Sequence, residues 1–96
     1  VILVFSEPSG VAASSTFPGV QNLLLSARAL GLGSVLTTLH PKVMHRVYAM
    51  FNIPDHMVFH CCIPLGYPRG NFGPTSRLPT AETTYWDSWN ASPPWK

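Results

Sequence analysis

Hydrophobic residues at several points along the chain form short unbroken runs of the kind found in covered β-strands. Residues 1–5 are apolar throughout and mostly β-branched or aromatic, which is typical of a strand buried on both faces. Residues 57–65 form a longer, mostly apolar run with β-branched and aromatic members, and Pro64 and Gly66 mark its end. We therefore predict two core strands, with a further short β-like run at residues 34–39.

Between these runs, apolar residues recur with the three- and four-residue spacing of amphipathic helices. The first helix is predicted to begin at Pro18, which suits a first helical turn, and to end at Gly31 and Gly33. A second helix is predicted to open at Pro41 and to end at residues 52–55. The predicted apolar faces hold Val20, Leu23, Leu24, Ala27 and Leu30 in the first helix, and Val43, Met44, Val47 and Phe51 in the second.

Residues 67–96 have a different composition from the rest of the chain. They are rich in Pro and Gly, which interrupt helices, and they contain all three Trp residues. A solvated linker does not need so many aromatic side chains. We expect an extended arm that lies on a protein surface, such as a partner's, with Trp86 and Trp89 as interface anchors.

Composition narrows the class of protein. Ninety-six residues and 10.5 kDa correspond to one domain or a piece of one, and the chain begins at Val1, inside a predicted strand, which favours a fragment of a longer domain. A net charge of +2 is too small for a nucleic-acid-binding surface, and no apolar run is long enough to cross a membrane. Two adjacent cysteines form no disulfide framework, so we expect a cytoplasmic protein.

Candidate catalytic groups are scarce. The His-Cys-Cys run at residues 60–62, with His56 nearby, contains metal-ligand types, but its spacing matches no closed zinc site. A cysteine with a histidine, or Ser34 with His40, is a conceivable nucleophile pair, yet no Gly-x-Ser-x-Gly turn is present. All four carboxylates fall in predicted loops or in the arm. We therefore interpret the cysteines as buried strand residues.

Two features are compatible with phosphate binding. The Gly-Leu-Gly of residues 31–33 lacks the remaining residues of a dinucleotide fingerprint or a P-loop, so it is interpreted as a helix end. Arg77 lies between two prolines and follows Thr75 and Ser76, a composition that can hold an anion through a bidentate guanidinium and two hydroxyls. Taken alone, however, Arg77 is more simply a solvated surface residue.

Several segments together resemble the C-terminal half of the FMN-dependent nitroreductase family. They are PGVQNLLLSARALGLGSVLTTLH at residues 18–40, IPLGYPRGNFGPTSRLP at residues 63–79, and the closing Tyr85-Trp86-Asp87 with Trp89. The resemblance extends over nearly the whole chain. The pieces occur in the family's order and at plausible spacing. This combination is far more specific than any one piece alone.

The resemblance implies a three-layer α+β flavoprotein, present here as a partial domain spanning residues 1–96. It implies a homodimer with FMN at the dimer interface, and hydride transfer from NAD(P)H through FMN to nitroaromatics, quinones or related acceptors. By position, four residues match the loop that offers backbone N–H groups to the flavin N5 edge, and Arg77 matches the residue that binds the FMN phosphate. The four loop residues are Leu36, Thr37, Thr38 and Leu39.

Two departures from the family pattern leave alternatives open. Some members have an acidic residue and a glycine where this chain has Thr38 and Leu39, and a lysine where it has Thr75. The family's N-terminal phosphate motif and Asn-rich flavin loop are absent from these residues. The alternatives are a non-catalytic remnant that serves only dimerisation, and a flavin site repurposed for another reduction.

Overall fold

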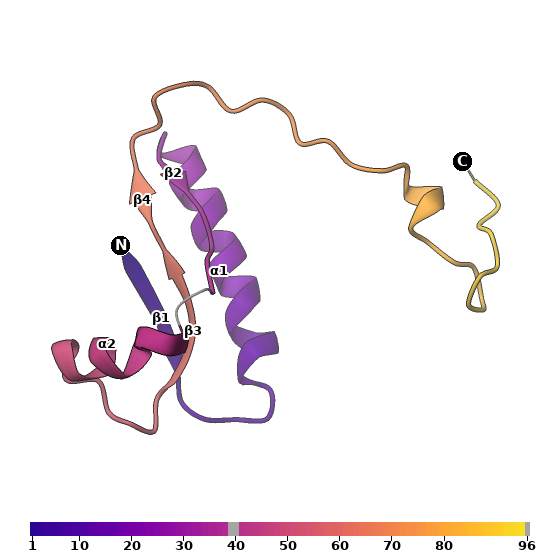
Figure 1. Ribbon diagram of the computed structural model, residues 1–96. Helices are drawn as coiled ribbons and strands as arrows, with labels where there is room; N and C mark the ends of the chain where they lie inside the picture. The colour runs from indigo at the N-terminus through magenta and orange to yellow at the C-terminus, as the bar shows by residue number, and fades with distance from the viewer. Residues whose placement is uncertain (39–40, 96) are drawn as a thin grey trace.

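The computed structural model describes residues 1–38 and 41–95, and it combines helices with antiparallel strands, which agrees with the predicted α+β class (Figure 1). None of the helices in these residues is both long enough and apolar enough to cross a membrane. The elements in chain order are strand β1 (Ile2–Ser6), helix α1 (Ala12–Ala29), strand β2 (Gly33–Ser34), 3-10 turn η1 (Pro41–Val43), helix α2 (Met44–Phe51), strands β3 (Val58–Ile63) and β4 (Leu65–Gly66), and 3-10 turn η2 (Thr80–Glu82).

Strand β3 and its continuation β4 lie at the centre of the sheet. On one side, β1 pairs with β3 in antiparallel fashion. On the other side, β2 pairs with β4, and Thr37 forms a further antiparallel bridge with Cys62. These pairs keep a single register, so residues 33–37 lie along residues 62–66 as one ladder. The ladder is interrupted opposite Pro64, which has no N–H to donate.

Helix α1 covers one face of this sheet. The most buried cluster consists of Val20 from α1 with Cys61 and Ile63 from β3, and both β3 residues are fully buried. Partly buried side chains surround the cluster: Ile2, Val4, Phe17, Leu23, Leu24, Leu36 and Leu65. Of the two predicted core strands, β3 supplies buried residues, whereas β1 is half-buried along its whole length, not buried on both faces as predicted, because α1 covers only one face of the sheet. The packing positions predicted for Leu23 and Leu24 are confirmed.

A β-bulge changes which face of the sheet the strand residues occupy. The pairing of β1 with β3 shifts between Val4 and Phe5, so that His60 is the extra residue on β3. The His60 ring contacts Phe17 of α1, and its Nε2 lies 2.8 Å from the Ser6 hydroxyl. Phe5 instead contacts Tyr48 of α2, with ring centroids 5.5 Å apart. The bulge thus supplies aromatic contacts for both helices.

The start of α1 differs from the sequence prediction. The helix begins at Ala12, not at Pro18, which lies in its interior. Residues 12–16 are small or hydroxyl-bearing and show no apolar periodicity, but the Ala12 N–H donates to the Ser9 carbonyl and the Ser15 N–H to that of Val11. The predicted end is confirmed: Gly31 has a φ of +78°, the left-handed conformation that glycine adopts most readily.

Three predicted core positions are exposed instead. Leu30 is 76% exposed, because it caps α1 beyond the stretch that packs on the sheet. Val43 and Phe51, at the two ends of the short helix α2, are 43% and 59% exposed. The packed side of α2 is formed by Met44, which is buried, with half-buried Val47 and Tyr48.

The structure describes residues 67–95 of the predicted arm. After β4 the chain leaves the body in an extended path, and η2 lies far from the sheet (Figure 1). The radius of gyration is 18.1 Å, compared with roughly 12 to 13 Å for a compact chain of this length. The far end folds on itself, with the rings of Trp86 and Trp95 5.2 Å apart.

Candidate functional site

The backbone of residues 35–38 forms the outer edge of the sheet. The Thr37 N–H donates to the Cys62 carbonyl and the Cys62 N–H donates to the Thr37 carbonyl, both at 2.9 Å. Successive N–H groups in an extended strand point in opposite directions. Those of Leu36 and Thr38 are therefore directed away from β3, toward the open edge.

The side chains of this segment hold it in place. Leu36 is half-buried and packs against the core cluster of Val20, Cys61 and Ile63. Thr37 is half-buried, whereas Thr38 is exposed. Leu39, the fourth predicted loop residue, lies outside the described residues, as does His40. Residues 36–38 thus offer mainly their backbone to a ligand. Hydrogen bonds to β3 and the packing of the Leu36 side chain in the core fix that backbone in place.

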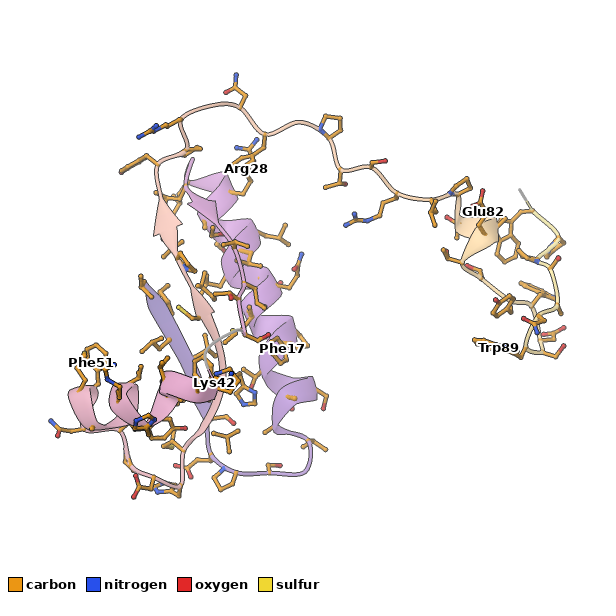
Figure 2. All side chains as sticks on the ribbon, viewed as in Figure 1. Phe17, Arg28, Lys42, Phe51, Glu82 and Trp89 are labelled. Atoms are coloured by element: carbon orange, nitrogen blue, oxygen red, sulfur yellow. The ribbon has the colours of Figure 1, made fainter. Side chains whose placement is uncertain are left out.

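Arg77 lies on the arm, and its surroundings are open. Its guanidinium is exposed, and Nη1 donates to the carbonyl of the neighbouring Ser76 at 3.2 Å. Figure 2 places Glu82 and Trp89, beyond Arg77 in the chain, far from Phe17 and Arg28 of α1. Within one chain the structure does not bring Arg77 together with residues 36–38.

The start of the arm makes a contact that the sequence analysis missed. Arg28, in the last turn of α1, places its Cζ 5.0 Å from the centre of the Phe72 ring. A hollow of about 360 Å³ lies beside this contact, and its lining includes Ser34 and Thr75. No local sequence pattern indicates the pair, since Arg28 and Phe72 are far apart in the chain.

The metal and nucleophile alternatives find little support in the geometry. Among residues 1–38 and 41–95, no three His, Cys, Asp or Glu side chains gather closely enough to share a metal ion. Burial raises the pKa of the Cys61 thiol, and the adjacent Cys62 raises it further. Cys61 therefore stays protonated at neutral pH, where a nucleophile would need to be a thiolate.

We expect the raised pKa of Cys61 to destabilise the fold at alkaline pH. Above the ordinary pKa of a cysteine, near 9.0, the unfolded chain loses the Cys61 proton while the folded chain keeps it. The free energy of unfolding then falls as pH rises. Urea titrations between pH 7 and pH 10 should show a weaker alkaline decline in Cys61→Ala than in the unmodified chain. Cys62→Ala is the matched control and should keep most of the decline, because burial of Cys61 is the larger cause of its raised pKa and the neighbouring thiol the smaller one. Identical slopes in all three proteins would contradict the assignment.

Comparisons of sequence and of structure with known proteins point to the same family. The nitroreductase family model matches residues 6–67, more than half of the chain. Two archaeal relatives carry the name "Putative NADH dehydrogenase/NAD(P)H nitroreductase". The one from Methanothermobacter thermautotrophicus is 44% identical over 55 residues, and the one from Archaeoglobus fulgidus is 37% identical over 51 residues. The matches cover 55% and 51% of this chain but only 29% of each relative.

Two solved structures with the same name share the fold. The Parabacteroides distasonis protein has a TM-score of 0.77 at 27% identity, and the Bacteroides thetaiotaomicron protein a TM-score of 0.77 at 25% identity. Each match covers 91% of this chain and 54% of the solved chain, so the present chain spans about half of those proteins. A match of 91% extends beyond residues 1–66 and therefore includes much of the arm. With the α+β architecture described above, the family match over residues 6–67 establishes that the chain belongs to the nitroreductase family.

Proposed function

We propose that the chain forms part of an FMN-dependent oxidoreductase that takes hydride from NAD(P)H and passes it to nitroaromatics, quinones or related acceptors. The observation that carries the proposal is the fixed backbone edge at residues 36–38, in a chain of the nitroreductase family. When bound, FMN supplies the redox chemistry, so the protein has only to bind, orient and tune it. A site made of backbone donors suits that task.

The segment at residues 36–38 fits the edge of a flavin ring. The outward N–H groups of Leu36 and Thr38 are donors for ring nitrogen or oxygen atoms. The two hydrogen bonds between Thr37 and Cys62 and the packing of Leu36 in the core keep these donors in place. Hydrogen bonds held rigidly in this way require little reorganisation when charge develops on a ligand.

The arm supplies the group that fits the FMN phosphate. Arg77 is exposed, and Thr75 and Ser76 place two hydroxyls next to it in the chain. A guanidinium can donate two parallel hydrogen bonds to a phosphate, and charge-assisted bonds of this kind are roughly twice as strong as neutral ones. We propose that Arg77 binds the phosphate, with the two hydroxyls assisting.

These two parts of the site can meet if the active form is a homodimer, with FMN at the interface. The arm leaves its own body, and the aromatic residues at its end are exposed, Trp89 to 81% and Trp86 to 48%. Large exposed aromatic side chains on an extended segment are typical of interface anchors. A cytoplasmic location is proposed with this assignment, because Cys61 and Cys62 are both free thiols.

Visible absorption and molar mass, measured on the same sample, test this proposal. The purified chain is incubated with FMN and desalted, and its spectrum and light-scattering mass are recorded. A flavin band on a species of twice the 10.5 kDa chain mass is the expected result. A colourless dimer would instead support the non-catalytic remnant, and a monomer would contradict the homodimer. Turnover with NAD(P)H and a range of acceptors then distinguishes a nitroreductase from a repurposed flavin site.

A further inference from the structure

We propose that Arg28 and Phe72 form a latch that positions the arm, and through it Arg77, for binding a phosphate group. The proposal deepens the function proposed above and rests on it, since it assumes that Arg77 binds the FMN phosphate. Arg28 and Phe72 are positioning residues in this scheme: they direct the arm and touch no ligand.

The latch is a contact between a cation and an aromatic face. The Arg28 Cζ lies 5.0 Å from the centre of the Phe72 ring, within the distance at which a guanidinium is attracted to a ring. Arg28 lies in the last turn of α1, at the end of the body where the arm begins after β4 (Figure 2). The contact therefore ties the arm to the most regular element of the body.

Glycine at position 33 makes room for the ring. A Cβ added at Gly33 would lie 3.4 Å from the Phe72 Cζ and 3.7 Å from the Pro68 Cβ. A Cβ at this position would be at the near limit of ordinary van der Waals contact with the ring. Phe72 is thus held between Gly33 of β2 and Arg28 of α1, although its side chain is still 54% exposed.

The latch shortens the tether that carries Arg77. With Phe72 fixed, Arg77 follows only five residues later, which limits its reach to about 17 Å. Without the latch, the tether starts at Gly66, where β4 ends, and is eleven residues long. Effective concentration falls roughly as the −3/2 power of tether length, so release should weaken phosphate binding about threefold.

The first test compares FMN with riboflavin, which has the same ring system but no phosphate, by fluorescence-quenching titration. Phe72→Ala and Arg28→Gln are expected to weaken FMN binding about threefold and to leave riboflavin binding unchanged. Phe72→Tyr keeps the ring and should restore the FMN affinity. Phe51→Ala is the matched control, since Phe51 is similarly exposed, at 59%, but lies at the end of α2. The double variant with Phe72→Ala and Arg77→Ala should bind FMN no more weakly than Arg77→Ala alone.

A second measurement follows the latch without any flavin. Arg69 lies in the part of the tether that the latch restrains, so trypsin should cleave after Arg69 severalfold faster in Phe72→Ala and Arg28→Gln than in Phe51→Ala. Unchanged cleavage together with unchanged FMN affinity would overturn the latch. If cleavage accelerates but Arg77→Ala binds FMN as well as the unmodified chain, the latch stands as a contact. In that case its role in phosphate binding is overturned, along with the assignment of Arg77.

Discussion

The Leu24→Asp variant is expected to lose its cooperative thermal transition. Leu24 packs against the buried cluster formed by Val20 of the same helix with Cys61 and Ile63 of β3. Aspartate at this position either carries a charge into the apolar interface or forces the helix away from the sheet. Either outcome costs roughly 3 kcal/mol or more. A small core supplies only a few kcal/mol of net stability, so such a loss removes most of it.

The neighbouring residue provides the matched control for this variant. Leu25 is 58% exposed, so Leu25→Asp introduces the same charge one residue further along α1 without entering the core. Its melting curve should stay close to that of the unmodified chain, with a change within about 1 kcal/mol. Circular dichroism during heating measures both variants. Equal melting curves for Leu24→Asp and Leu25→Asp would contradict the packing of α1 on the sheet.

The regular elements of the body could largely be predicted from the sequence, because their signal is the spacing of apolar side chains. That signal is clear in β1, β3 and the second half of α1, which all contribute to one core. The spacing of apolar side chains is absent at residues 12–16, where small side chains form a helix without an apolar face. Without that signal, the sequence favours Pro18 as the first turn, although Pro18 is accommodated inside the helix.

The β-like run predicted at residues 34–39 illustrates a second limit. Within its described residues, 34–38, Ser34 alone belongs to a regular strand, β2 (Gly33–Ser34), and Thr37 forms an isolated bridge. The cause lies on the partner strand, where Pro64 removes one donor from the ladder. The sequence shows Pro64, but it does not show that Pro64 lies opposite this segment. Pairing register depends on contacts between distant parts of the chain, which local patterns do not encode.

The candidate site, too, could be predicted only in part from the sequence. The family resemblance selects residues 36–39 and Arg77, but the outward direction of the Leu36 and Thr38 N–H groups follows only from the bridge between Thr37 and Cys62. The contact between Arg28 and Phe72 was not predictable, since neither residue belongs to a motif. The arm was predicted as extended from its composition; its departure from the body becomes visible only in three dimensions.

Replacing Arg77 by alanine is expected to weaken FMN binding about ten- to a hundredfold. This range corresponds to the roughly 1.5–3 kcal/mol that a hydrogen bond to a charged group contributes when it is shielded from water. The expected loss is confined to FMN, because riboflavin has no phosphate for Arg77 to bind. Fluorescence-quenching titrations with both ligands measure the difference directly.

Two further variants separate charge from geometry in this interaction. Arg77→Lys keeps the positive charge but loses the planar fork, so its FMN affinity should fall between those of the unmodified chain and Arg77→Ala. Arg69→Ala removes another arginine of the arm and should leave FMN affinity unchanged. Because the ion pair is partly screened by salt, the Arg77-dependent part of the affinity should also shrink as salt is raised. If Arg77→Ala and Arg69→Ala bind FMN equally well, Arg77 does not bind the phosphate.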